Sequence, residues 1–237
     1  MSWHPSGMRK VRCPAAALPL LLVLAAACGR QAPEPPGPPD SAAMAAPAPQ
    51  ASTGTLVFLG DSLTAGLGLP REEAFPALIE ARLAAEGRPW KVVNAGISGD
   101  TTAGGAARLD WIYRQKVDVM FVCLGANDGL RGIPVHETER NLRTILARAR
   151  KEGTRVVLAG IQLPGNYGTS YRAAFARIFP RLAKEFQIPL LPFLLEGVAM
   201  EPSLNQSDGI HPNAAGARRV ADHAWTALDP VLRAPAR

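Results

Sequence analysis

Cysteine is scarce in this sequence, which has three among 237 residues. Cys13 and Cys28 lie within the first 28 residues, so Cys123 is alone in the rest of the chain and no disulfide can form there. This distribution excludes a small disulfide-stapled module, and a chain of this length buries a core without such support. Because Cys123 lies in an apolar stretch, we interpret it as a small buried hydrophobic residue.

Histidine is nearly as rare, with four in the chain. No His or Cys pair has the spacing of zinc ligands, and no glycine-rich phosphate-binding fingerprint is present. We therefore predict neither a metal nor a cofactor. His4 precedes the first apolar run, and His136 and His223 fall in helical patterns, which leaves His211 as the histidine of interest.

Charged residues make up only 19% of the chain, with 26 basic and 20 acidic side chains and a net charge of +6. Arg9, Lys10 and Arg12 precede the first apolar run, so that 23 basic residues face 20 acidic ones beyond residue 27. The others mostly mix with glutamates in helical patterns, as in residues 135–152. Such mixing is typical of a solvated helix face, and we expect no nucleic-acid partner.

Residues 1–27 have the pattern of a secretory signal peptide: a basic region, an apolar run over Ala15–Ala27, and small residues before Cys28. The apolar run has 13 residues. A membrane-spanning helix needs about 20. The pattern predicts export rather than a stable anchor helix.

Residues 24–28, Leu-Ala-Ala-Ala-Cys, resemble a bacterial lipobox, which implies that Cys28 becomes a lipidated first residue. Gly29 follows in place of the aspartate that signals retention at the inner membrane, so we expect a periplasmic protein anchored to the outer membrane by lipid. Ala25 stands where leucine is most usual. This leaves a second interpretation open, in which signal peptidase cleaves after Ala27 and releases a soluble protein.

Residues 28–54 form a linker by composition. Seven prolines and seven alanines lie between Gly29 and Gly54, with almost no large apolar side chain. A proline-rich tether of this kind would hold the following domain, residues 55–233, away from a membrane surface. A disordered tail without a function would have the same composition, so the sequence leaves both interpretations of residues 28–54 open.

Short apolar runs alternate with helical patterns over the rest of the chain, which predicts an α/β fold with a parallel sheet covered on both faces. In such sheets, sites form beyond the carboxyl ends of the strands. The predicted strands are Thr55–Leu59, Lys91–Asn94, Val117–Leu124, Arg155–Gly160 and Pro189–Phe193, and the predicted helices are Ala74–Glu86, Thr101–Gln115, Val135–Glu152, Ser170–Gln187 and Asn213 to about Leu228.

Four polar segments occupy the predicted strand ends or precede the last helix. Gly60-Asp61-Ser62-Leu63 follows the first strand and places a serine where a helix begins, although Asp and Ser also cap helices. The residues 94–101 and 125–129 follow the next two strands, where ordinary turns and a cap at Asp100 or Thr101 would explain the same residue types. Asn127 carries an amide that can donate to an oxyanion, whereas Asp128 suits a role in organising the loop.

Asp208-Gly209-Ile210-His211-Pro212 is the most specific of these segments. A spacing of three residues lets one turn bring the carboxylate to the imidazole. Asp208 can then fix the ring tautomer while His211 faces the serine as a base.

Together these segments resemble the four sequence blocks of the SGNH or GDSL hydrolase superfamily, over essentially residues 55–230. The resemblance is strongest to its bacterial periplasmic acyl-CoA thioesterase, lysophospholipase and arylesterase group, also through Leu163-Pro164-Gly165-Asn166-Tyr167-Gly168. It implies a flavodoxin-like three-layer α/β/α sandwich with a five-stranded parallel sheet in the order 2-1-3-4-5. It further implies a catalytic triad of Ser62, Asp208 and His211.

The same resemblance implies an oxyanion hole formed by the backbone N–H groups of Ser62 and Gly99 and the side-chain amide of Asn127. Gly99 is preferred to Gly96 because the family's Ser-Gly-Asp-Thr run aligns on it. Leu163 and Pro164 lie in a loop that relatives use to bind the acyl chain. Ala126 stands where some relatives have glycine, and its methyl group either trims the acyl pocket or has no effect.

These features predict a monomeric serine hydrolase that cleaves ester or thioester bonds of small-molecule or lipid acyl substrates. Two alternatives remain open from the sequence. One is a carbohydrate O-deacetylase with the same site, and the other is a tethered envelope-binding protein whose site is vestigial.

Overall fold

One parallel sheet of five strands forms the centre of the computed structural model, which describes residues 53–234. The strands are ordered β2-β1-β3-β4-β5, so the predicted order is confirmed. Their bounds are β1 Thr55–Gly60, β2 Lys91–Gly96, β3 Val119–Cys123, β4 Arg155–Ala159 and β5 Leu190–Leu191.

The central strands are buried on both faces, which explains their unbroken apolar sequences. Residues 56–59 of β1 and 119–123 of β3 are fully buried, without the alternation of a half-exposed strand. The Phe58 ring packs edge-on against Phe75 at a centroid distance of 5.4 Å, and lies 5.5 Å from Phe121. This aromatic group joins the centre of the sheet to the helix that follows the first loop.

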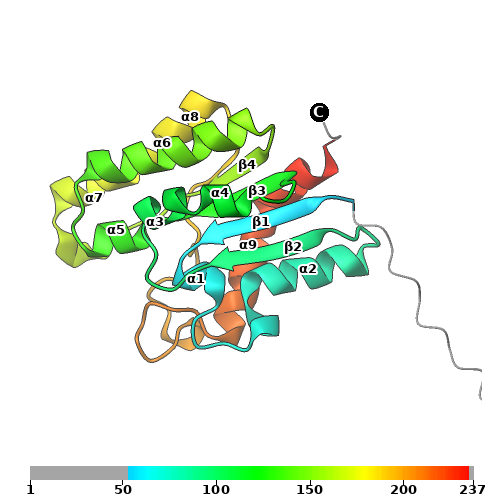
Figure 1. Ribbon diagram of the computed structural model, residues 1–237. Helices are drawn as coiled ribbons and strands as arrows, with labels where there is room; N and C mark the ends of the chain where they lie inside the picture. The colour runs from blue at the N-terminus through cyan, green and yellow to red at the C-terminus, as the bar shows by residue number, and fades with distance from the viewer. Residues whose placement is uncertain (1–52, 235–237) are drawn as a thin grey trace, which may run out of the picture. The chain divides into compact units, whose positions relative to one another are not determined.

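Helices cover both faces of the sheet (Figure 1). Helix α9 packs against α2 and against β3, β4 and β5, whereas α6 packs against α3, α8 and β4. The strand arrows in Figure 1 point toward α1, α3 and α5, so the carboxyl ends of the strands and these short helices share one edge. The helices are α1 Ser62–Ala65, α2 Phe75–Ala85, α3 Thr102–Ala107, α4 Leu109–Ile112, α5 Ala126–Leu130, α6 Val135–Lys151, α7 Thr169–Ala176, α8 Ile178–Phe186 and α9 Ala214–Arg233, with 3-10 turns η1 Arg71–Glu73, η2 Gly165–Tyr167 and η3 Pro202–Leu204.

Two of the predicted helices are each divided in two. The first ends and restarts at Arg108, whose side chain turns toward the sheet. The second restarts after Arg177, near Pro180, which has no N–H to donate to the preceding turn. The last helix continues to Arg233, beyond the predicted end near Leu228.

The structure also differs from the sequence-based prediction at two shorter segments. The fifth strand pairs over Leu190–Leu191 only, although five residues were predicted to be extended. Residues 126–130, expected to form a turn, make the one-turn helix α5. Both segments are too short for hydrophobic periodicity to identify.

The predicted signal peptide, residues 1–27, and Cys28 lie outside the described residues, as does all of the predicted linker except Thr53 and Gly54. Those two residues already belong to the domain edge, because the Thr53 N–H donates to the Pro89 carbonyl at 2.6 Å and the Gly54 carbonyl accepts from Lys91 N–H at 2.9 Å. Within residues 53–234, no helix has the length and apolar character needed to cross a bilayer.

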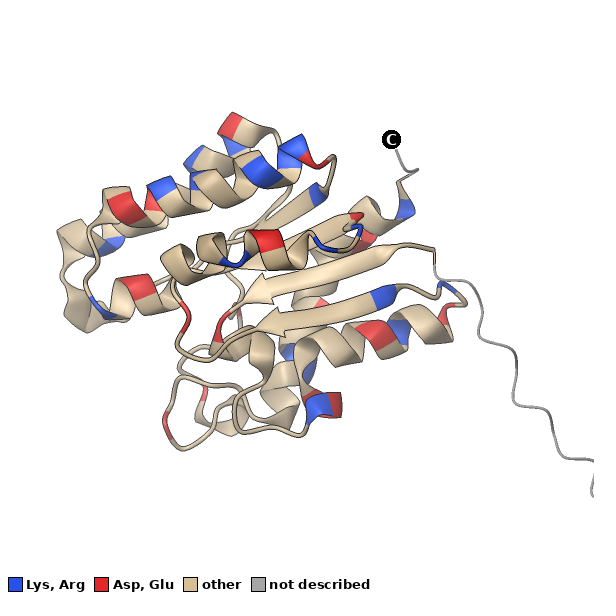
Figure 2. Cartoon of the chain, in the orientation of Figure 1, with Lys and Arg blue, Asp and Glu red and all other residues tan. Residues whose placement is uncertain are grey.

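Basic and acidic residues are interspersed along the outer helices, while the strands carry few charged residues (Figure 2). On α6, Arg143 contacts Glu139 at 2.7 Å and Glu185 at 2.9 Å. Such exposed pairs contribute little to stability, typically about 0 to 1 kcal/mol each. Their mixed signs fit the solvated helix face expected from the sequence.

The close approach of α1 to β2 requires glycine at position 96. A Cβ at this position would lie 2.3 Å from the backbone nitrogen of Ala65. We expect Gly96→Ala to lower the free energy of unfolding by about 1 to 3 kcal/mol, because the backbone of α1 must shift. Urea denaturation measures this change.

Gly165→Ala is the matched control, because a Cβ there meets nothing within 4 Å. It is expected to change stability by less than about 0.5 kcal/mol. Equal stability losses in the two variants would contradict the steric explanation.

Candidate active site

Ser62 is held at the turn between β1 and α1. Asp61 precedes it as the N-cap, and its Oδ1 accepts from the Leu63 N–H at 3.1 Å. The helix is only four residues long and ends at Gly66, which has the left-handed conformation (φ 74°). A half-buried serine is thereby fixed at the carboxyl end of a central strand.

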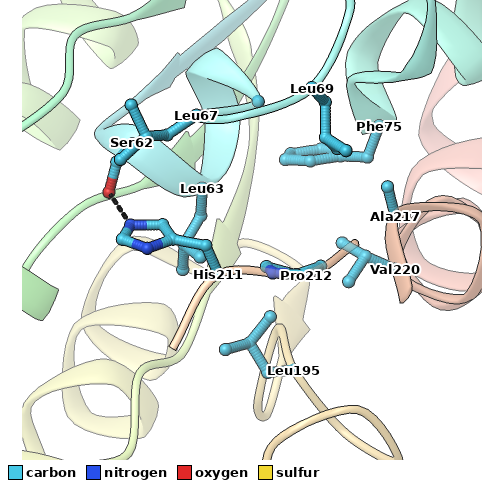
Figure 3. Close-up of a pocket in the computed structure, with 11 residues that line it drawn as sticks. Ser62, Leu63, Leu67, Leu69, Phe75, Leu195, His211, Pro212, Ala217 and Val220 are labelled. Atoms are coloured by element: carbon cyan, nitrogen blue, oxygen red, sulfur yellow. Dashed lines mark hydrogen bonds between the residues drawn. The ribbon is translucent and has the colours of Figure 1, made fainter. Parts of the chain in front are cut away.

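The three side chains of the predicted triad lie in one hydrogen-bonded row. The Nε2 atom of His211 lies 2.8 Å from Ser62 Oγ (Figure 3), and its Nδ1 lies 2.6 Å from Asp208 Oδ2. When Nδ1–H donates to the carboxylate, Nε2 has a free lone pair that accepts the serine proton. The row therefore has the geometry of a nucleophile, a base and a group that orients the base.

Backbone donors hold the Asp208 carboxylate in place. Its Oδ1 accepts from the Ile210 N–H at 2.9 Å and from the His211 N–H at 3.0 Å. These two donors, followed by the His211 ring, lower the pKa of Asp208 to about 2. Asp208 is thus ionised at any pH above that value, and because its side chain is 45% exposed, water also stabilises the charge.

The segment that carries His211 is fixed at both ends. On one side the Gln206 N–H donates to the His211 carbonyl at 2.8 Å, beside a bridge between Asn205 and Pro212. On the other side Asn213 caps α9, its Oδ1 accepting from the N–H groups of Ala215 and Gly216 at 3.0 Å each. The imidazole is therefore positioned by the start of the last helix.

Gly99 and Asn127 lie at the ends of the two strands that flank β1. Gly99 has φ 80°, a conformation that favours glycine. Within the described residues, neither the Ser62 N–H nor the Gly99 N–H donates a hydrogen bond. The Asn127 amide donates one N–H to the Asp100 carbonyl at 2.9 Å and has a second to offer.

An ion pair between Arg108 and Asp100 connects these strand ends, and sequence reasoning missed it. Arg108 Nε donates to Asp100 Oδ2 at 2.9 Å, and Nη2 donates to the Gly60 carbonyl at 3.0 Å. The two side chains are only 14% and 12% exposed. An arginine among small and apolar residues of a predicted helix was the available signal.

Asp128 organises the loop after β3, as its position suggested. It is fully buried and accepts from the Thr102 N–H at 2.9 Å, from the Thr102 hydroxyl and, at 3.4 Å, from the Thr138 hydroxyl. These bonds fix α5 against the start of α3.

The N-cap of α3 is Thr101, whose hydroxyl accepts from the Gly104 N–H. Asp100 was the other residue predicted to cap this helix.

A groove of about 310 Å³ runs beside the row of side chains. Leu163 and Pro164, predicted to bind substrate, both line it, as does Ala126 with its additional methyl group. Leu63 and Ile210, the neighbours of Ser62 and His211, connect the groove to the site. Its remaining lining residues are Leu130, Ile161, Gln162, Gly165, Arg172, Phe193, Leu195, Ala199, Met200 and Gly209.

Asp61 is an unusual carboxyl group directly before the serine. It is fully buried, and its Oδ2 atom has no hydrogen-bond partner among the described residues. Burial raises its pKa to about 6, against the smaller opposing effects of the Leu63 N–H and the nearby His211.

Residues 53–234 contain no group of three or more His, Cys, Asp or Glu side chains that could hold a metal ion.

The sequence of residues 58–219 matches the GDSL-like Lipase/Acylhydrolase family. The chain belongs to this family. Among its members, esterase TesA of Pseudomonas aeruginosa is 45% identical over 184 residues, which cover 77% of this chain and 92% of the relative. The thioesterase 1/protease 1/lysophospholipase L1 of Escherichia coli K12 is 43% identical over 183 residues, which cover 77% and 86%.

A crystal structure of TesA has the same fold, with a TM-score of 0.72 and 44% identity over 75% of this chain and 99% of that one. The superfamily predicted from the sequence blocks is therefore confirmed, together with its fold.

The buried Asp61 carboxyl predicts a pH-dependent cost to stability. Its folded pKa is raised from 3.8 to about 6, so the native state loses stability as pH rises through this interval. The loss amounts to about 3 kcal/mol by linkage. In Asp61→Asn the group no longer titrates, so the stability of the variant relative to wild type should increase by most of that amount, about 2 kcal/mol, between pH 4 and pH 7.

Urea unfolding at pH 4, 5, 6 and 7 measures the effect. Asp222→Asn is the control, because that side chain is 74% exposed. If the free energies of unfolding of Asp61→Asn and wild type change in parallel with pH across this range, Asp61 is not a buried group that ionises there.

Proposed function

We infer that this chain hydrolyses ester and thioester bonds of acyl substrates, and we propose that it does so through an acyl-enzyme on Ser62. The observation that carries the mechanism is the row from Ser62 Oγ through the His211 ring to Asp208, with contacts of 2.8 and 2.6 Å. Membership of the GDSL-like family and the names of its relatives support ester hydrolysis.

In the proposed first step, Ser62 Oγ attacks the substrate carbonyl carbon while His211 Nε2 takes the hydroxyl proton. Asp208 stays ionised and stabilises the imidazolium through Nδ1–H. The tetrahedral intermediate collapses when the bond to the leaving oxygen or sulfur breaks, and His211 returns the proton to that atom. An alcohol or thiol leaves, and the acyl group remains on Ser62.

Water completes the cycle by the same steps. His211 removes a proton from water as the oxygen attacks the acyl carbon, and then returns the proton to Ser62 Oγ as the acyl–oxygen bond breaks. The product is a carboxylic acid. In both steps the negative charge develops on the carbonyl oxygen, where Ser62 N–H, Gly99 N–H and the Asn127 amide are the proposed donors. The bond from Asn127 to the Asp100 carbonyl orients that amide.

We assign the acyl chain to the groove that Leu163 and Pro164 line. Apolar side chains provide most of its walls, and water leaves them when an acyl chain binds. The leaving group is a thiol, a phenol or the glycerol of a lysophospholipid.

We also propose that the enzyme is exported, with residues 1–27 as the signal peptide and residues 28–54 as a tether. Lipidation of Cys28 would place the domain at the periplasmic side of the outer membrane, and the lipobox-like residues 24–28 support this assignment.

Hydrolysis of p-nitrophenyl esters from acetate to palmitate, run beside Ser62→Ala, tests the proposal. We expect activity that peaks at medium or long chains and falls by at least about a thousandfold in the variant, because the nucleophile is removed. Activity confined to acetate would favour a carbohydrate O-deacetylase. No activity at any chain length would leave a tethered binding protein or an enzyme with a narrow, different substrate, and full activity in Ser62→Ala would disprove the acyl-enzyme.

Asn127→Ala tests the oxyanion donor. Turnover should fall by about 100- to 1000-fold, the usual effect of removing one such donor, with little change in thermal stability. Asn166→Ala, which removes an exposed amide from the loop beside the groove, is the control and should leave turnover unchanged. A near-normal kcat for Asn127→Ala would remove this residue from the mechanism.

A further inference from the structure

Arg172 is the one charged residue among those that line the groove. It lies on α7 and is partly buried, and its Nε donates to the Leu163 carbonyl at 2.9 Å. This bond holds the guanidinium against the wall that Leu163 forms. Leu163 in turn is 6% exposed and packs so closely over Gly129 that a Cβ there would lie 2.2 Å from it.

The guanidinium has no acidic partner in the described part of the chain. No carboxylate of residues 53–234 lies within the 4.0 Å of an ion pair, and the bond to Leu163 is the one hydrogen bond that this side chain makes there. By contrast, Arg143 and Arg148 each contact two carboxylates. The Nη groups of Arg172 therefore keep four N–H donors without a protein acceptor.

An apolar chain that filled the groove as far as Arg172 would displace water from those donors and leave them unpaired. Burying a charged donor without a partner is costly, whereas a carboxylate or phosphate pairs with a guanidinium through two parallel hydrogen bonds. The groove thus combines apolar walls for a hydrocarbon segment with one cation that an anion would satisfy.

We propose that Arg172 binds an anionic group, a carboxylate or a phosphate, in the part of the substrate that occupies this groove. The inference rests on the proposed function and gives that function a substrate class: acyl esters that carry a negative charge away from the scissile bond. With the acyl chain in the groove, as assigned above, the charge lies at the far end of that chain; a charge on the leaving group would place the leaving group in the groove instead.

Two pairs of substrates distinguish these sources, with the purified protein as catalyst. The first pair is p-nitrophenyl octanoate and the p-nitrophenyl monoester of suberic acid, which share chain length and leaving group but differ by a terminal carboxylate. The second pair is a 1-acylglycerol and the 1-acylglycerol 3-phosphate with the same chain. For each pair, the measured quantity is the ratio of kcat/KM for the anionic member to kcat/KM for the neutral member.

We expect Arg172→Gln to lower this ratio by about tenfold or more in one of the pairs, as the loss of a charge-assisted hydrogen bond predicts. The pair that responds identifies where the anion is carried. Arg177→Gln is the matched control, since it removes an equal charge from an exposed position near the same helix and should leave both ratios unchanged.

An equal ratio in wild type and Arg172→Gln for both pairs would overturn the proposal. If kcat/KM falls equally for the anionic and the neutral member, the ratio is unchanged in this way, and Arg172 only supports the Leu163 carbonyl. If Arg172→Gln does not fold, Arg172→Met keeps the aliphatic stem without the charge and serves in the same comparison.

The wild-type enzyme provides a test that needs no variant. With Arg172 as partner, at least one anionic substrate should react within about tenfold of its neutral counterpart. A penalty above about a hundredfold in both pairs, expected for an unpaired anion in an apolar groove, would contradict the proposal. Ser62→Ala separates the two hypotheses. Retained activity in Ser62→Ala would refute the acyl-enzyme. An inactive Ser62→Ala, together with substrate ratios that Arg172→Gln leaves unchanged, would refute only the role of Arg172.

Discussion

The ion pair between Arg108 and Asp100 joins the three strand ends on which the site is built. Through Gly60 it reaches the turn that carries Ser62, and through the Asp100 backbone it reaches Gly99 and the Asn127 amide. Because both side chains are largely buried, the cost of their desolvation offsets much of the Coulomb attraction, and the net stabilisation is small. The main effect of the pair is to fix geometry, because a guanidinium with partners on two loops prevents either loop from moving alone.

Two carboxyl groups of the site show how strongly surroundings control ionisation. Asp208 is half exposed and accepts two backbone N–H groups besides the imidazole, which lowers its pKa to about 2. Asp61 is buried with one backbone donor, and its pKa is raised to about 6. Between these values the first group is charged and the second is largely neutral. As pH falls between these two values, Asp208 therefore keeps the negative charge that faces His211, whereas Asp61, directly before Ser62, becomes neutral.

The sequence was most informative where local pattern and function coincide. Apolar runs located the strands because β1 and β3 are buried on both faces, and the polar segments after them identified the loops at one edge. Asp208 and His211 were recognisable as a pair because three residues separate them. The breaks at Arg108 and Arg177 were not, since each depends on a side chain or a proline acting within a segment whose composition is helical throughout.

Contacts between distant parts of the chain were also beyond the sequence. Arg108 reaches Gly60, 48 positions earlier, and the groove is assembled from α5, the loop after β4, α7 and the segment between β5 and α9. Leu163 and Pro164 were placed in it through the family resemblance, whereas Arg172 was not, because nothing in a helical pattern tells which side chain faces a neighbouring loop. Burial of the Asp61 carboxyl likewise depends on the surrounding fold.

Ser62 and His211, whose side chains lie 2.8 Å apart in the site, are separated by 149 positions in the sequence. During synthesis the serine and its strand emerge early, whereas the histidine follows near the end and is fixed only when α9 docks on the sheet. A nascent or truncated chain thus carries a serine without a base. Ser62 therefore has its base only when the segment before α9 is in place, so a chain in which that segment is absent or undocked lacks the group that activates the serine.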